Sequence, residues 1–213
     1  MRSLLTLIAV VLIGLIAAPV QAQDFRLPPP PEDHPPLLVG EFTLPIAFPI
    51  SRSILCPGDG SCPFGGGGGV GASLSWRYPT GFAAGFGYDV WLLDGNSVYA
   101  ITTLQWLGGF VRYYLLRQSR IHPFVSGGLG FILFGDTFQD NAPGAGLDAA
   151  VGAEIEISST LAFTSSLGLR LFAIGPFRSG SDGVARAQGF GVSTAIALTF
   201  GLVLLQSPMS ELR

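Results

Sequence analysis

The 213-residue sequence predicts an all-β fold, a single eight-stranded antiparallel barrel with an apolar exterior. Three observations predict it. Only 12% of the residues are charged and 48% are hydrophobic, whereas about 25% are charged in an average soluble domain. Apolar and small or polar residues alternate with a period of two over long segments. After residue 22, no stretch contains the 18 or more apolar residues that a membrane-spanning helix requires.

Composition excludes several classes of protein. The net charge is −3 and the chain contains no lysine, so it lacks the basic stripe of a nucleic-acid-binding protein, and we expect no nucleic-acid partner. A mean hydropathy of +0.51 excludes the polar composition of a disordered chain. A membrane protein and an unusually apolar secreted protein remain.

Residues 1–22 are predicted to be a cleaved signal peptide. Arg2 supplies the positive start, residues 4–18 form an uncharged apolar run, and Val20 and Ala22 are the small residues of a cleavage site. A retained membrane anchor is the alternative, which the shortness of the run disfavours. The next segment, 23–36, is predicted to be a proline-rich periplasmic linker. It is followed by a barrel domain over 37–203 and a periplasmic tail over 204–213.

The alternation places large apolar residues on one face of each strand. In 69–78 the even positions include Val70, Leu74 and Trp76, and the odd positions are glycine, serine and one arginine. A soluble sandwich or lipocalin would carry many charges on the second face. Small residues with sparse charges are instead typical of a narrow barrel whose exterior contacts lipid. The predicted strands are 37–48, 67–78, 81–93, 98–115, 121–134, 144–157, 160–174 and 188–203.

The connections and the aromatic residues support an up-and-down barrel of the bacterial outer-membrane type. Short turns at 79–80, 117–120 and 158–159 alternate with longer loops at 49–66, 94–97, 135–143 and 175–187. Aromatic residues predict two bands at the headgroup levels. They are Trp76, Tyr78, Phe82, Tyr113 and Phe124 near the turns, and Tyr88, Trp91, Tyr99, Phe131, Phe172, Phe177 and Phe190 near the loops.

Two features depart from a plain alternation. In 98–115, Gln105 and Trp106 lie on the wrong faces for one register, so we expect a bulge or a slip there. Cys56 and Cys62 flank a turn-forming Pro-Gly-Asp-Gly-Ser segment, which predicts a local disulfide in an oxidising compartment. Two thiols without a nearby histidine fall short of a zinc site, and we expect no metal or cofactor.

Residues 108–114 (GGFVRYY) and 121–131 (IHPFVSGGLGF) resemble the OmpA-like family of eight-stranded outer-membrane barrels. In that family a proline–aromatic pair and then Gly-x-Gly begin the fifth strand. The resemblance covers roughly 37–203 and implies a structural barrel, an adhesin, a small pore or a receptor. It also implies outer-membrane lipid, including lipopolysaccharide, and the outer-membrane assembly machinery as partners. Members of that family without a further domain commonly end on an aromatic residue. This chain departs from the pattern, because 13 residues follow Phe200.

The sequence predicts charged side chains inside the barrel, because an arginine on the lipid face costs about 2–4 kcal/mol at the midplane. The predicted interior ion network is Glu41, Arg77, Asp89, Arg112, Asp148, Glu154, Glu156 and Arg170. We interpret it as a plug, since eight strands leave room for little more than side chains. Because carboxylates outnumber arginines in this set, a small cation-preferring pore is the alternative.

Two other functions are alternatives to the structural or surface-interaction role that the sequence predicts. Some eight-stranded barrels hydrolyse lipid acyl chains with a serine and a histidine two residues apart on one strand. Here the only strand histidine is His122, and position 124 is phenylalanine, so no catalytic residues are predicted. A soluble periplasmic lipocalin-like binder is the alternative at the level of the fold. The predicted role lies in loops 49–66, 135–143 and 175–187.

Overall fold

The computed structural model describes residues 36–51, 55–56, 62–96, 98, 100–116, 119–136, 142–178, 183–187 and 191–206. The predicted signal peptide, all of the predicted linker except Pro36, and residues 207–213 lie outside this range, so those assignments remain predictions. In the described part of the chain, no helix is long and apolar enough to cross a membrane.

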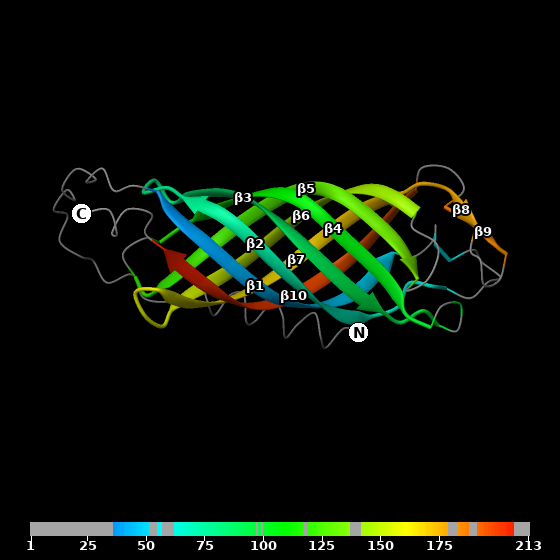
Figure 1. Cartoon of the computed structure of the whole chain (residues 1–213), viewed down its shortest axis with the longest axis horizontal. Helices are drawn as coiled ribbons and strands as arrows, with labels where there is room; N and C mark the ends of the chain where they lie inside the picture. Colours follow the sequence, from blue (N-terminus) through cyan, green and yellow to red (C-terminus); the bar gives the residue numbers. More distant parts are fainter. Residues whose placement is uncertain are drawn as a thin grey trace, which may run out of the picture. The chain divides into compact units, whose positions relative to one another are not determined.

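Eight antiparallel strands close into a barrel, as predicted (Figure 1). Each strand pairs with the next one along the chain, and the first strand also pairs with the last, from Leu38 opposite Gln206 to Ser51 opposite Thr194. The barrel strands are β1 (Leu37–Ser51), β2 (Gly67–Arg77), β3 (Phe82–Leu93), β4 (Thr102–Tyr114), β5 (Ile121–Asp136), β6 (Ala142–Glu156), β7 (Leu161–Ile174) and β10 (Gly191–Gln206). Two short strands, β8 (Phe177–Arg178) and β9 (Ala185–Arg186), pair with each other in the connection between β7 and β10.

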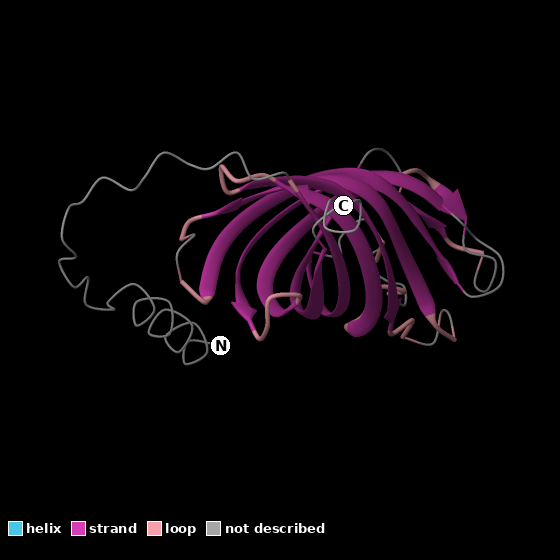
Figure 2. Cartoon of the chain, turned by 60° about the vertical axis from the view of Figure 1, so that its left-hand side comes forward, coloured by secondary structure: helices cyan, strands magenta, loops and turns pink. Residues whose placement is uncertain are grey.

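Closure removes the free strand edges. Figure 2 shows the strands curving around a common axis. Because lipid offers no hydrogen-bonding partner, a sheet can cross a membrane only when both of its edges are paired. We call the end of the barrel with the short β2–β3, β4–β5 and β6–β7 connections the turn end, and the opposite end the loop end.

The prediction of a bulge or a slip in the fourth strand is wrong. β4 pairs with β3 and with β5 in one continuous register, from Leu93 opposite Thr102 to Phe82 opposite Tyr113 on the β3 side. Trp106 points inward and is buried, while Gln105 points outward, where its Oε1 accepts a hydrogen bond from the hydroxyl of Tyr88 at 2.8 Å. The alternation is misleading here because this strand carries a large residue inside the barrel and a polar residue outside it. Among the described strands, a register shift occurs between β1 and β10 at Pro49–Ser51.

The outward face of the barrel is apolar. Side chains from every barrel strand are exposed there, and Phe131 is 74% exposed although it is a large aromatic residue. Other exposed members are Phe42, Leu44, Val70, Leu74, Phe86, Leu92, Leu107, Val111, Val125, Leu129, Leu147, Val151, Leu167, Leu169, Val192 and Leu202. A continuous apolar surface of this extent on a soluble protein would drive association, and it suits contact with lipid.

The predicted aromatic bands form only in part. Trp76, Tyr78, Phe82 and Tyr113 are exposed near the turn end, and Tyr88 and Phe131 are exposed toward the loop end. Three members of the predicted bands are instead buried, namely Phe124, Trp91 and Phe172. Their inward direction follows from the strand period, since each lies an odd number of residues from an outward neighbour on its own strand. Tyr99 and Phe190 lie outside the described residues.

Candidate functional site in the barrel interior

Three ion pairs cross the lumen. Arg77 Nη2 on β2 lies 2.6 Å from Glu154 Oε2 on β6, and Arg170 Nη2 on β7 lies 2.8 Å from Asp89 Oδ2 on β3. In the barrel order these strands are four apart in either direction, so each pair joins opposite walls. A third pair joins Arg112 and Glu41. Side chains that meet across the barrel leave little open cross-section along its axis.

Tyr114 completes the layer nearest the turn end. Its hydroxyl accepts a hydrogen bond from Arg77 Nη2 at 2.5 Å and donates one to Glu154 Oε2 at 3.0 Å. The Arg77 guanidinium also lies 4.1 Å from the centre of the Tyr114 ring. The Glu154 side chain is fully buried, so its charge depends on these two partners for compensation.

Arg112 joins this layer to the next. Its Nη2 donates to Glu41 Oε2 at 3.0 Å and its Nη1 donates to the Tyr114 hydroxyl at 3.3 Å. The guanidinium lies 4.2 Å from the centre of the Phe124 ring, which packs edge-on against Tyr114. A planar cation stacked on a ring and held by a carboxylate has few rotamers available, which fixes this side chain in the lumen.

Arg170 lies between two tryptophans. Its guanidinium carbon is 4.5 Å from the centre of the Trp91 ring and 4.4 Å from that of Trp106. Room for the Trp106 indole comes from three glycines that face one another across β4, β5 and β6. A Cβ atom at Gly108, Gly130 or Gly146 would lie 2.7–2.8 Å from an indole atom. These glycines therefore form a slot for the ring.

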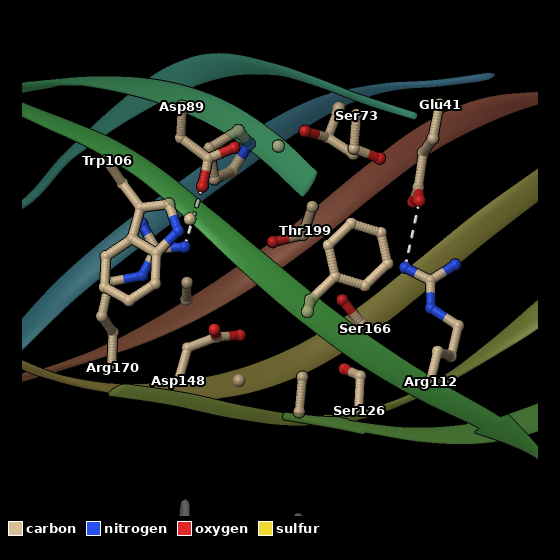
Figure 3. A pocket seen from close by; sticks show the side chains of 18 of the residues that line it. Glu41, Ser73, Asp89, Trp106, Arg112, Ser126, Asp148, Ser166, Arg170 and Thr199 are labelled. Atoms are coloured by element: carbon tan, nitrogen blue, oxygen red, sulfur yellow. Dashed lines mark hydrogen bonds and ion pairs between the residues drawn. The ribbon is translucent and has the colours of Figure 1, made fainter. Parts of the chain in front are cut away.

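A polar cavity of about 140 Å³ lies between the Arg112 and Arg170 layers (Figure 3). Its lining includes Asp89, Glu41 and Asp148 and the hydroxyl-bearing residues Thr43, Ser73, Ser126, Ser166 and Thr199. Asp148 lies opposite Arg170 in the register of β6 and β7. Arg170 nevertheless reaches across the lumen to Asp89, and Asp148 forms no ion pair with any described residue. The lining thus holds three carboxylates and two guanidinium groups.

Glu156 lies apart from the other seven residues of the predicted network. It is at the turn end, its side chain is 40% exposed, and its Oε1 lies 2.8 Å from His122 Nε2. The other ring nitrogen of His122 lies 2.8 Å from the carbonyl oxygen of Leu116. This pair fastens the β4–β5 connection to the end of β6 and does not cross the lumen.

An apolar cluster fills the loop end. We call it the outer plug, and its buried members include Leu55, Phe64, Trp91, Leu93, Val98, Leu104, Trp106, Ile132, Phe134, Phe172 and Ile174. The Phe64 ring packs edge-on against Phe172 and Phe134, with centroids 5.3 and 6.3 Å away. Cys56 and Cys62 form a disulfide beside the plug, with Cα atoms 4.5 Å apart. The loop end thus holds an apolar cluster, which the buried Arg186 contacts through the Leu55 carbonyl oxygen, and the three ion pairs lie below it.

The sequence analysis did not predict the aromatic residues that line this interior. Tyr114, Phe124, Trp91 and Trp106 contact the three arginines, yet three of them were assigned to the lipid face or to an irregular strand, and Tyr114 to no role. The available signal was the period of two, since Tyr113 points outward and Tyr114 must then point inward. Among the described residues, no group of three or more His, Cys, Asp or Glu side chains could hold a metal ion.

Comparison with known proteins identifies solved structures with a similar fold. No family model matches the chain, and no curated protein matches it by sequence. Among solved structures it is similar to Neisserial surface protein A, with a TM-score of 0.55 and 14% identity over 78% of this chain and 96% of that one. OprG from Pseudomonas aeruginosa gives 0.48 at 11% identity, covering 81% and 96% of the two chains. The outer membrane protein AlkL gives 0.48 at 12%, covering 91% and 100%. The chain therefore has the closed eight-stranded fold of the small outer-membrane β-barrels.

Proposed function

We propose that this protein resides in the bacterial outer membrane as an OmpA-like barrel without catalytic activity, closed to ions, whose loops carry a structural or surface-interaction role. Its partners are outer-membrane lipid, including lipopolysaccharide, and the outer-membrane assembly machinery. The exposed apolar belt on a closed barrel supports the location. The three ion pairs across the lumen carry the proposal of a closed barrel, since they join its opposite and near-opposite walls.

The surroundings of His122 argue against a lipid-modifying enzyme. Both of its ring nitrogens are engaged, one by the Leu116 carbonyl and one by Glu156. A histidine that acts as a general base needs a free nitrogen within reach of its nucleophile. The side chain is also buried, packed edge-on against Tyr114.

The location has a direct test. We expect the protein in the outer-membrane fraction of cells that express it, and we expect unboiled samples to migrate faster on SDS gels than boiled ones. The reason is that a closed barrel with every strand paired resists detergent and stays compact until it is heated. A soluble periplasmic protein without a heat-dependent shift would contradict the proposal and favour a lipocalin-like binder.

Conductance distinguishes a closed barrel from a small pore. We expect no current steps from the purified protein in a planar bilayer, with the heat-dependent gel shift as the control that a folded barrel was added. The cavity favours a cation-preferring pore as the second candidate, because Asp148 contributes a carboxylate that forms no ion pair within the described part of the chain. Cation-selective current steps would contradict the closed barrel. If the Asp148→Asn variant also lowered their cation selectivity, the small pore would be the better proposal.

A further inference from the structure

A groove of about 860 Å³ crosses the outward face of the barrel over β4, β5, β6 and β7. Its floor is the backbone of one row of residues that lie opposite one another in the register of these strands, namely Gly108, Gly130, Gly146 and Phe172. The side-chain positions of this row point into the barrel. The groove therefore exposes bare backbone between two rows of outward side chains.

The two rows of outward side chains form unequal walls. Over β5, β6 and β7 the wall toward the turn end consists of Leu129, Leu147 and Leu171. In the wall toward the loop end, Phe131 is 74% exposed, but its neighbours across β6 and β7 are Ala145 and Ala173. The rows are two residues apart along each strand, about 7 Å, so the space between them admits one linear hydrocarbon chain.

Trp106 lies directly behind the floor of the groove. On the inner side, a Cβ atom at Gly108, Gly130 or Gly146 would lie 2.7–2.8 Å from an indole atom. The outer side of the same three residues lines the groove. One thickness of backbone therefore separates the indole from the occupant of the groove.

The position of the groove within the apolar belt identifies the chemistry of its occupant. Exposed apolar side chains lie on every barrel strand that the groove crosses, and such a belt contacts the hydrocarbon of a membrane. The predicted linker 23–36 and the predicted tail 207–213 each contain acidic and basic residues, and charged side chains are costly in hydrocarbon. The occupant thus comes from the lipid and not from these two segments.

We propose that the groove is a binding site for one acyl chain of a bilayer lipid, which lies across β4–β7 on the glycine floor over Trp106. The inference rests on the proposed location in a membrane, and it adds where on the barrel a lipid is held. Because the strands of such barrels are tilted by about 35–45°, a row across them runs oblique to the barrel axis. A bound chain is thus oblique to the surrounding lipid chains, and dispersion contacts with the floor and both walls hold it there.

Quenching of Trp106 fluorescence by brominated acyl chains measures the occupancy of the groove. Of the three tryptophans, Trp76 is 44% exposed on the outward face and Trp91 is buried, so Trp76→Phe combined with Trp91→Phe leaves Trp106 as the single emitter. We expect strong quenching of this variant in phosphatidylcholine vesicles whose stearoyl chains are dibrominated at mid-chain. In this background Ala145→Phe fills the groove beside Phe131, and we expect the quenching to become several-fold weaker.

Ala149→Phe is the matched control. Ala149 is exposed on the same face of β6 but lies outside the groove, so a phenylalanine there should leave the quenching unchanged. Equal quenching in the Ala145→Phe and Ala149→Phe variants would overturn the proposal, because contact with ordinary surrounding lipid would then explain the signal. Quenching that rises when the protein is diluted with lipid would also overturn it, since a second copy of the chain would then occupy the groove.

The heat-dependent gel shift separates failure of this inference from failure of the proposed function. An unsubstituted protein that lacks the shift, or does not enter vesicles, would contradict the membrane barrel itself. A barrel that shows the shift and inserts, yet is quenched equally in both phenylalanine variants, would contradict the acyl-chain site alone. If the Trp91 substitution abolishes the shift, the same comparison is made in Trp76→Phe, where both remaining tryptophans are buried.

Discussion

Replacing Glu154 with alanine is expected to lower the free energy of unfolding of the barrel by about 3–5 kcal/mol, the cost of removing one partner of a buried ion pair. Glu154 is fully buried, and Arg77, which it neutralises, is 13% exposed. The variant leaves a guanidinium in the lumen without a countercharge, and the Tyr114 hydroxyl loses the acceptor to which it donates. Urea titration, followed by loss of the faster-migrating unboiled band, measures the change.

Glu156→Ala is the matched control for this variant. It removes the same side chain from the same strand two residues later, where the carboxylate is partly exposed and faces His122. We expect a change within about 0–1 kcal/mol, as for other exposed pairs. Arg77→Met combined with Glu154→Met should recover most of the stability lost in the single variant, because no charge is then left buried alone. Equal costs for Glu154→Ala and Glu156→Ala would show that the cross-lumen pair contributes little.

The second large effect on stability is expected from filling the slot that three glycines form for Trp106. Gly130→Ala is expected to destabilise the barrel by about 1–3 kcal/mol, the usual cost of overpacking. The added Cβ would lie 2.8 Å from the Gly108 Cα, the Leu107 carbonyl oxygen and the Trp106 ring. Two of these three contacts are backbone atoms of the neighbouring strand, which cannot move aside as a flexible side chain does.

Gly109→Ala provides the comparison on the neighbouring strand. A Cβ at Gly109 would meet its nearest atom, the Gly85 carbonyl oxygen, at 3.7 Å, which is ordinary van der Waals contact. We expect its free energy of unfolding to stay within about 0.5 kcal/mol of that of the unsubstituted protein. The same urea titration applies to both variants. Similar costs at the two positions would mean that intrinsic strand preference, and not the slot, explains the glycines.

The strands and their faces could be predicted because two simple constraints act on every residue. Lipid outside and a narrow lumen inside impose a period of two, and closure imposes an even number of strands with alternating turn lengths. The prediction was wrong where individual residues depart from the rule, as the inward-facing Trp91, Trp106 and Phe124 do. Trp106 is large and points inward, and no local signal shows that three glycines on β4, β5 and β6 make room for it. That information lies in the register between strands.

Partners within the ion network were not predictable for the same reason. Asp148 and Arg170 face each other on adjacent strands, which would suggest a pair, yet Arg170 reaches Asp89 on the opposite wall. The choice depends on the width of the lumen and on the two indole rings that hold the guanidinium. Residue type and strand period show that a charge points inward, but they do not show which opposite charge it meets.

The seam between β1 and β10 has a consequence for the order of folding. It joins the two barrel strands that are farthest apart in sequence, so its loop-closure entropy is the largest in the barrel, and local hairpins form before it. The pairing of β1 with β10 is continuous from Leu38 to Pro49, whereas its pairing with β2 is interrupted at Pro45, which has no amide hydrogen to donate. The β1–β10 seam is thus the last pairing of the barrel to form. Until it forms, two unpaired edges cannot enter lipid, so insertion and closure must be coupled.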